Sequence, residues 1–248
     1  MARRKLIAAN WKMNGDLSLC ASMQNAINQC QISEDVAIVI APPYTLIAAL
    51  SSSDRLSIGA QNVSQFDQGA YTGELSTTML KNAGCEYVIV GHSERRELFG
   101  ETNQIVAEKF VKIARAGLKP ILCVGESLSE REAGVTNSIL QEQIQAVISC
   151  SSSEDWMDAV IAYEPVWAIG TGKTATPEMA QEAHHFLREL LQLSNVTKVH
   201  ADNLRILYGG SMKPDNAAEL LSQDDIDGGL VGGASLKPDS FTAILSAA

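Results

Sequence analysis

The sequence has few of the residues that build disulfide frameworks or metal sites. Its 248 residues include five cysteines and four histidines. The cysteines are odd in number and contain no C-x-x-C pair, and the histidines form no H-E-x-x-H pattern. Such spacings are the usual signature of a disulfide scaffold or a zinc site. We therefore expect neither, and we expect no structural or catalytic metal.

Long apolar runs are also missing. No run approaches the about 18 residues that a membrane-spanning helix needs. The apolar stretch at 6–9 stops at Asn10, which is too short for a secretion signal. We expect a cytoplasmic protein that does not enter a membrane.

Positive charge is scarce as well. Lysine and arginine together number 19 against 29 acidic residues, which gives a net charge of −10. This charge repels nucleic acids and anionic membranes at long range. We expect no nucleic-acid partner, and any anionic ligand must be met by donors placed locally.

What the sequence does contain is a repeated pattern of short apolar runs. Continuous rather than alternating apolarity indicates strands that are buried on both faces. The eight runs lie at 5–10, 36–41, 56–61, 87–91, 119–124, 159–163, 204–208 and 226–231.

Most segments between these runs have a helical period. The segment that starts at Thr176 and Pro177 has a capping hydroxyl followed by proline, a pattern typical of a helix start. Its charged residues should lie mainly off the apolar face; they are Glu178, Glu182, Arg188 and Glu189. The apolar face itself takes Met179, Ala183, Phe186, Leu187, Leu190 and Leu191. A second helix carries Ile105, Val106, Phe110 and Ile113 on one face and should end at Gly117.

Eight rounds of strand and helix in one chain of this length match a closed (β/α)₈ barrel better than an open sheet. Such a barrel has eight parallel strands with the helices outside. No linker rich in proline, glycine or serine divides the chain, so we predict a single domain over residues 1–248. In this architecture the chemistry lies at the carboxyl ends of the strands.

Glu164 stands where the strand 159–163 stops, and Pro165 follows it. A glutamate taken at random is usually a surface carboxylate. Here the residue precedes a loop with an apolar, exposed tip and two glycines, between stiffer ends, which is typical of a lid that moves as a unit and excludes water. The predicted lid consists of Pro165, Val166, Trp167, Ala168, Ile169, Gly170, Thr171, Gly172, Lys173, Thr174 and Ala175.

The lid glycines also fit two nucleotide-binding patterns formally. Residues 170–175 match G-x-G-x-x-A, but that pattern should follow its strand at once, and six residues intervene after Tyr163. A Walker loop would need glycine at the position of Trp167. We exclude both.

Two further strand ends carry basic side chains. Lys12 follows the first strand and is either solvated or a cation beside Glu164. His92 follows the fourth strand and opens a short helical stretch, although a lone histidine is more often structural. The positive end of that helix disfavours an imidazolium, so His92 could stay neutral and donate hydrogen bonds.

The last two strands end in glycines, in Tyr208-Gly-Gly-Ser211 and in Gly232-Gly-Ala-Ser235. Glycines let main-chain amides approach a ligand, and barrels commonly hold phosphate in these two loops. We predict that an anion is bound by amides of Gly170, Ser211, Gly232 and Gly233. Cys123 ends the fifth strand, and we interpret it as a packing residue beside Glu164 rather than a nucleophile.

Five motifs resemble the triosephosphate isomerase family, in the family's order and over essentially the whole chain. They are N-W-K at 10–12, the loop 62–74, G-H-S-E-R-R at 91–96, A-Y-E-P-V-W-A-I-G-T-G-K-T-A-T at 162–176 and the glycine loops with Y-G-G-S at 208–211. Val124 and Met212 stand where the family often has isoleucine and valine, and we expect only packing consequences.

The resemblance implies a TIM barrel that interconverts dihydroxyacetone phosphate and D-glyceraldehyde 3-phosphate through an enediolate, in glycolysis and gluconeogenesis, without a cofactor. It implies Glu164 as the base, His92 as a neutral electrophile, Asn10 as a substrate-binding residue and Lys12 as an electrostatic residue, with Glu94 as the carboxylate behind Lys12. It also implies a homodimer in which Tyr71, Thr72 and Gly73 lie at the interface and Thr72 approaches the neighbouring site. Read without the resemblance, the loop 62–74 could be a surface loop.

Two rival functions stay open at this level. Another phosphate-binding barrel enzyme is one, such as a phosphoribosyl isomerase or a Schiff-base aldolase that uses a lysine nucleophile. A non-catalytic phosphate-binding descendant is the other. It predicts losses among Asn10, Lys12, His92 and Glu164, and all four are present.

Overall fold

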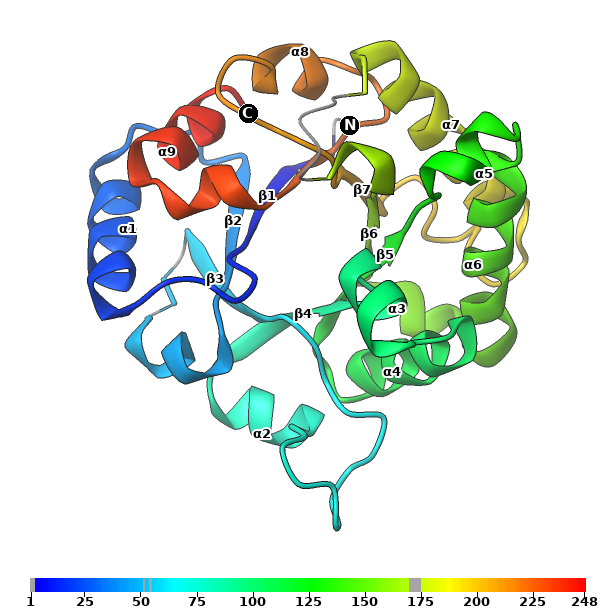
Figure 1. Ribbon diagram of the computed structural model, residues 1–248, viewed down its shortest axis with the longest axis horizontal. Helices are drawn as coiled ribbons and strands as arrows, with labels where there is room; N and C mark the ends of the chain where they lie inside the picture. The colour runs from blue at the N-terminus through cyan, green and yellow to red at the C-terminus, as the bar shows by residue number, and fades with distance from the viewer. Residues whose placement is uncertain (1–2, 51, 54, 170–174) are drawn as a thin grey trace.

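Eight parallel strands close into a barrel in the described part of the chain (Figure 1). The structure is a computed structural model that describes residues 3–50, 52–53, 55–169 and 175–248. Each strand pairs with the next one along the chain, and β8 pairs with β1 from Leu6↔Gly228 to Ala9↔Val231. The strands are β1 (Lys5–Asn10), β2 (Val36–Ala41), β3 (Leu56–Ala60), β4 (Cys85–Val90), β5 (Lys119–Val124), β6 (Val160–Tyr163), β7 (Arg205–Tyr208) and β8 (Gly228–Val231). The predicted (β/α)₈ barrel is confirmed.

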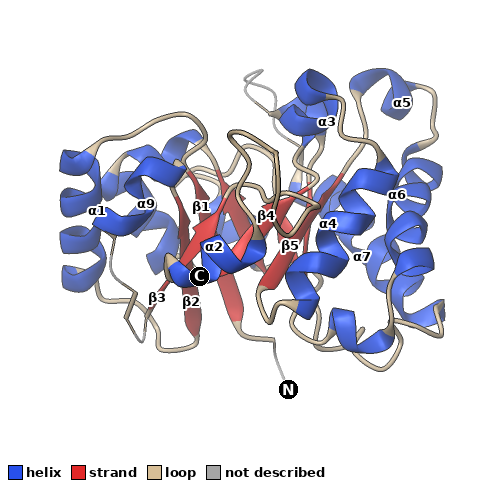
Figure 2. Ribbon diagram, turned by 90° about the horizontal axis from the view of Figure 1, so that it is seen from below, coloured by secondary structure: helices blue, strands red, loops and turns tan. Residues whose placement is uncertain are grey.

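The helices form an outer ring around the strands, as Figures 1 and 2 show. Neighbouring helices pack against one another, for example α1 against α9 and α4 against α6. They are α1 (Leu17–Gln29), α2 (Thr77–Asn82), α3 (Ser93–Phe99), α4 (Asn103–Arg115), α5 (Leu128–Glu132), α6 (Thr136–Cys150), α7 (Pro177–Leu193), α8 (Ala217–Leu221) and α9 (Pro238–Ser246).

Two apolar layers hold the barrel together. The larger layer lies between the strands and the helices. The smaller one is built mainly from strand residues whose side chains alternate with those of the outer layer, and it fills the barrel; it contains Leu6, Ala8, Val39, Ala41, Tyr87, Ile89, Ile121, Cys123, Val160, Ala162, Leu207 and Leu230. Because both faces of each strand are buried, the runs read as continuously apolar in the sequence.

The strand boundaries differ from prediction by one or two residues. β4 begins at Cys85 instead of residue 87, β3 ends at Ala60, and β6 and β7 begin one residue later than predicted. β8 begins at Gly228 instead of residue 226. Gly228 has φ +149°, and a Cβ there would lie 1.8 Å from the carbonyl oxygen of Leu6. The chain can approach β1 this closely only through a glycine, which fixes where the last strand starts.

The predicted helix start after the lid is confirmed. Thr176 caps α7, its side chain accepting a hydrogen bond from the amide of Met179 at 3.2 Å, and Pro177 is the first helical residue. Gly117 follows α4 with φ +74°, as expected of a residue that ends a helix.

The prediction for Arg188 is wrong. This arginine is buried within α7, where its guanidinium lies 2.6 Å from Asp227 Oδ2 and donates to the carbonyl of Ala201 at 2.9 Å. A buried guanidinium is tolerated because its donors are matched by a carboxylate and by main-chain oxygens. Helical periodicity registers the charge of the residue but not partners that lie so far along the chain.

Candidate active site

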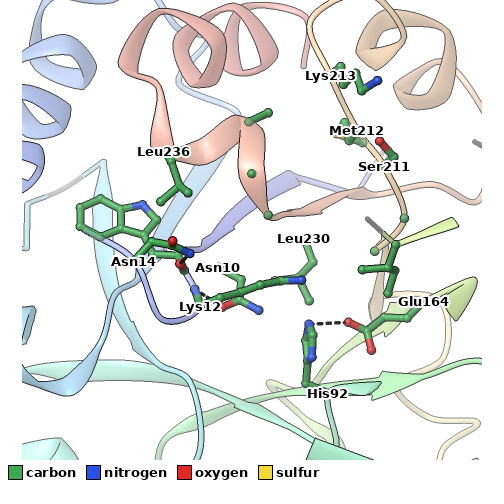
Figure 3. Close-up of a pocket in the computed structure, with 17 residues that line it drawn as sticks. Asn10, Lys12, Asn14, His92, Glu164, Ser211, Met212, Lys213, Leu230 and Leu236 are labelled. Carbon is green, nitrogen blue, oxygen red and sulfur yellow. Dashed lines mark hydrogen bonds and ion pairs between the residues drawn. The ribbon is translucent and has the colours of Figure 1, made fainter. Parts of the chain in front are cut away.

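A cavity of about 460 Å³ lies at the carboxyl ends of the strands (Figure 3). Every described residue of the predicted site lines it except Glu94; these are Asn10, Lys12, His92, Glu164, Ser211, Gly232 and Gly233. They follow or end strands β1, β4, β6, β7 and β8. The closed barrel therefore brings together residues that are up to 223 positions apart in sequence (233 − 10).

Glu164 and His92 lie next to each other and both line this cavity (Figure 3). Glu164 Oε1 lies 3.0 Å from His92 Nε2, and both side chains are buried. Glu164 Oε2 accepts a hydrogen bond from the amide of Ser93 at 2.9 Å. Oε1 is buried, and none of the described residues gives it an aligned hydrogen bond. One carboxylate oxygen thus anchors the side chain, while the other keeps a lone pair directed into the cavity.

The backbone of Glu164 is also held tightly. Its amide donates to the carbonyl of Val124 at 2.8 Å. A Cβ on Gly125 would lie 1.7 Å from the carbonyl oxygen of Glu164, so the end of β5 can approach the end of β6 only with glycine at position 125. The backbone of Glu164 is therefore placed by main-chain contacts that do not depend on a flexible side chain.

The electrostatics of the pair are coupled. Burial opposes ionisation of Glu164, but His92 and the Ser93 amide lower the pKa of the carboxyl below its ordinary value. Burial also opposes a charged His92, yet the Glu164 carboxylate raises the pKa of the imidazole. The contact of His92 Nδ1 instead favours the neutral form of the ring. Nδ1 accepts a hydrogen bond from the amide of Glu94 at 3.2 Å, and an imidazolium has no lone pair to accept it.

His92 lies at the amino end of α3, as the sequence predicts. Because Nδ1 accepts from the first turn of that helix, the single proton of a neutral ring sits on Nε2, which faces Glu164 and the cavity. This arrangement fixes both the tautomer and the direction of the donor.

Lys12 is placed by an unusual backbone conformation. Its φ of +53° is the only positive value among the described non-glycine residues. Its amide donates to Asn10 Oδ1 at 3.1 Å, and its ammonium lies 2.8 Å from Glu94 Oε1. Such a strained residue persists only where its surroundings fix it, and strained residues cluster at functional sites. The structure thus brings Glu94 behind Lys12, where the resemblance expects it.

Gln61 supports Lys12 and was not singled out in the sequence. Its side-chain amide donates to the carbonyl of Lys12 at 2.8 Å and to that of Ala41 at 2.9 Å. Its position could have identified it as a candidate site residue, since Gln61 is the first residue after β3 and thus also lies at the carboxyl end of a strand.

The described part of the predicted lid differs from expectation in its exposure. Gly170, Thr171, Gly172, Lys173 and Thr174 lie outside the described residues. Residues 166–168 form a single 3₁₀ turn, in which Ala168 is buried. Trp167 and Ile169, which were expected to be exposed, are both half-buried, so that expectation is wrong.

Glu126 explains the burial of Trp167. This carboxylate is fully buried, and one oxygen, Oε1, accepts from Trp167 Nε1 at 2.9 Å and from the Tyr163 hydroxyl at 3.1 Å. Arg131 lies 3.3 Å from the same oxygen, and its guanidinium stacks 5.0 Å from the centroid of the Trp167 ring. No sequence pattern predicts this cluster, because its members come from β5, β6, α5 and the segments next to them and meet only in the fold.

The glycine-rich side of the cavity lies opposite the Glu164–His92 pair. Ser211, Gly232 and Gly233 line it, and Gly233 opens a short 3₁₀ helix (Gly233–Leu236). Ser235 shapes this loop by donating both its amide, at 2.8 Å, and its hydroxyl, at 2.7 Å, to the carbonyl of Gly232.

Cys123 packs inside the barrel, as predicted. Burial raises the pKa of its thiol well above the ordinary value, and the negative charge of Glu164 adds to this effect. A thiol of this kind stays protonated and is a poor nucleophile.

Within the described ranges, no group of three or more histidine, cysteine, aspartate or glutamate side chains is arranged to hold a metal ion. None of the helices in the described part of the chain is both long and apolar enough to cross a membrane.

Comparison with known proteins agrees with the geometry. The family model described as triosephosphate isomerase matches residues 5–248. A triosephosphate isomerase of Halorhodospira halophila is 57% identical over 248 residues, covering 99% of this chain and 98% of its own. Those of Herminiimonas arsenicoxydans and Pseudoalteromonas translucida are 55% and 51% identical, covering 99% and 100% of this chain and 100% and 98% of their own. The chain belongs to the triosephosphate isomerase family of enzymes.

Proposed function

We propose that this isomerase interconverts dihydroxyacetone phosphate and D-glyceraldehyde 3-phosphate through an enediolate, with Glu164 as the base. The observation that carries the proposal is the buried Glu164 carboxylate, which lines the cavity with Oε1 3.0 Å from His92 Nε2. Because His92 and the Ser93 amide lower the pKa of this carboxyl, it is ionised at neutral pH and can accept a proton.

The isomerisation moves two protons: one passes between neighbouring carbons through Glu164, and one passes from the hydroxyl oxygen to the former carbonyl oxygen of the enediolate. Glu164 Oε1 removes the proton from the carbon next to the carbonyl, and the electron pair moves into an enediolate. The neutral carboxyl then returns the proton to the neighbouring carbon. The Ser93 amide holds Oε2 throughout and keeps the carboxyl in one orientation.

His92 and Asn10 serve the oxygens on which negative charge develops. His92 donates from Nε2, whose proton is positioned by the Nδ1 contact with α3. The carboxylate charge is what raises the pKa of His92. When Glu164 takes the carbon-bound proton, the negative charge passes to the enediolate. The Nδ1 contact with the Glu94 amide favours the neutral ring as the donor to it, because an imidazolium has no lone pair to accept that amide. Lys12, held by Glu94, adds a fixed positive charge at the same end of the cavity.

The phosphate end of the substrate is assigned to the glycine side of the cavity. We propose that amides of Ser211, Gly232 and Gly233 receive it, and Gly170, outside the described residues, completes the predicted set. Support comes from the position of these loops after β7 and β8, where barrels commonly hold phosphate.

We assign residues 165–175 to a lid that closes over the bound substrate. The contacts of Trp167 with Glu126 and Arg131 hold the amino end of this segment in the arrangement seen here. Closure must therefore be driven by contacts that the substrate phosphate makes, which would couple a distant binding interaction to exclusion of water from Glu164.

A homodimer is proposed from exposed apolar side chains that lie mainly on or near the segments after β1, β3 and β4. The loop between β3 and α2, which carries Tyr71, Thr72 and Gly73, projects from the barrel (Figure 1). Its tip is preformed, because the rings of Phe66 and Tyr71 stack with centroids 4.1 Å apart. The exposed residues are Met13, Leu17, Phe66, Tyr71, Met79, Leu98 and Phe99. Patches of this kind mark interfaces, and a mass measurement in solution tests the proposal.

We further propose that residues 1–248 act as one domain, that the enzyme works in the cytoplasm and that it serves glycolysis and gluconeogenesis. All five cysteines are free, which fits a reducing compartment.

The test of the reaction is a coupled assay in both directions, run on wild type and on Glu164→Gln. Wild-type turnover of both triose phosphates, with loss of at least about 10²-fold in the variant, is expected. Absence of wild-type turnover would refute the assignment of substrate. Full activity of the variant would refute the assignment of the base.

A further inference from the structure

A second cleft adjoins the active-site cavity on its glycine side. It has a volume of about 410 Å³ and shares Lys213, Gly233 and Ala234 with that cavity. Lys237 also lines it. Figure 3 shows Lys213 beside Ser211, on the opposite side of the cavity from His92.

Both lysine side chains are exposed, and neither ammonium has a hydrogen-bond or ion-pair partner within the described residues. Lys12, by contrast, is paired with Glu94. Asp215 is the single acidic residue among those lining the second cleft in the described chain, so its rim carries more positive than negative charge.

The backbones that carry these two lysines are fixed even though their side chains are free. The amide of Lys213 donates to Asn216 Oδ1 at 2.8 Å, and Asn216 Nδ2 donates to the carbonyl of Ser211 at 3.0 Å. Lys237 caps α9, and its carbonyl accepts the amide of Phe241 at 2.9 Å. Each ammonium therefore moves within a limited range at the rim of the glycine loops.

The net negative charge of the protein opposes the approach of a dianionic substrate. The net charge of −10 repels the substrate at distances up to about a Debye length, roughly 8–10 Å at physiological salt. Unpaired cations at the mouth of a site reverse the potential locally and raise the rate at which an anion arrives.

We propose that Lys213 and Lys237 guide the phosphate end of the substrate to the loops after β7 and β8 before any chemistry occurs. They are positioning residues that act on the approach of the dianion. The inference rests on the proposed function in one respect, namely that these loops receive the phosphate.

The experiment measures kcat/KM for D-glyceraldehyde 3-phosphate as a function of ionic strength. The variants are Lys213→Gln, Lys237→Gln and the double variant. Lys198→Gln is the matched control, because Lys198 is an exposed lysine in the connection from α7 to β7, at the other end of the barrel, and removes the same charge. D-Glyceraldehyde, which lacks the phosphate, is the control substrate.

We expect the double variant to lose about 3- to 10-fold in kcat/KM at ~10 mM ionic strength, and the loss to shrink to less than about twofold at ~0.5 M, where the field is screened. Lys198→Gln should show neither change, and kcat/KM for D-glyceraldehyde should be the same in all variants.

An active enzyme whose double variant matches Lys198→Gln at low salt would overturn the inference. So would a loss that persists at high salt or that appears equally with D-glyceraldehyde, because either indicates a structural or direct-contact effect. An inactive wild type would instead refute the proposed function.

Discussion

Shortening Glu164 by one methylene tests how far catalysis depends on the position of its carboxylate. Glu164→Asp keeps the charge and the chemical type but withdraws the carboxyl by one carbon–carbon bond, about 1.5 Å. In the native arrangement Oε2 is 2.9 Å from the Ser93 amide and Oε1 is 3.0 Å from His92 Nε2. A carboxyl withdrawn by that amount cannot hold both contacts and leaves the 2.6–3.2 Å range, roughly, within which a general base works.

Two general magnitudes limit the loss of kcat that is expected for Glu164→Asp. A displacement of ~1 Å at a reacting group costs about 10²-fold, and a positioned base supplies ~10²–10⁴-fold in all. We therefore expect kcat to fall by roughly 10²–10³-fold, about 3–4 kcal/mol in the activation free energy. KM should change little, because the glycine loops to which we assign the phosphate are separate from the Glu164 side chain.

The assay is steady-state turnover of both triose phosphates. Glu97→Asp is the matched control, since Glu97 is exposed on α3 and does not line the cavity. Turnover of Glu164→Asp within about threefold of wild type would refute the role of Glu164 as base. A large rise in KM with unchanged kcat would show that the side chain binds substrate instead.

Three further outcomes follow from the structure. Burial lowers the pKa of His184 to about 4, whereas the unfolded value is about 6.5. The stability that this residue contributes is therefore fully present above pH ~6.5 and is lost as the pH falls toward ~4. The total change in the free energy of unfolding is roughly 3 kcal/mol. Urea unfolding across that range should show a flatter pH dependence in His184→Gln, and an unchanged slope would contradict the assignment. Arg188→Met removes one of the two guanidinium partners of Asp227 within the described residues, the other being Arg3, and takes a donor from the carbonyls of Ala201 and Leu204. It should lower the free energy of unfolding by about 1–3 kcal/mol, whereas an unchanged stability would show that the pair is not a stabilising one. Deletion of the lid tip should leave weak phosphate binding but release methylglyoxal and inorganic phosphate from the unprotected enediolate, and a product stream containing only the two isomers would contradict a protective lid.

The architecture could be predicted because each strand and helix of the barrel leaves a recognisable pattern in the sequence, and the pattern repeats eight times. Strands buried on both faces give continuous apolar runs, and the residues that follow β1, β4 and β6 carry the polar side chains of the cavity. Asn10, Lys12, His92 and Glu164 were therefore found from their position at strand ends together with the resemblance, and the closed sheet does bring them together.

What the sequence did not predict depends on partners far along the chain. The helical period of α7 predicts that Arg188 lies off the apolar face. The residue is buried instead, because Asp227 and two carbonyls in the connection to β7 accept its hydrogen bonds. Trp167 reads as exposed because the loop around it is short and apolar, and only the fold brings Glu126 to its indole. Strand starts such as Gly228 depend on a close approach of two backbones, which has no periodic signal.

The fate of the carbon-bound hydrogen tests the central claim most directly, because a base at Glu164 exchanges its proton with water while it holds it. Dihydroxyacetone phosphate should be incubated with the enzyme in D₂O, with the product trapped as it forms and examined by mass spectrometry. We predict that product from the wild type carries deuterium at the carbon that receives the proton, and that Glu164→Gln loses turnover and exchange together. Product formed at the full wild-type rate with no solvent deuterium, or exchange that survives in Glu164→Gln, would contradict it.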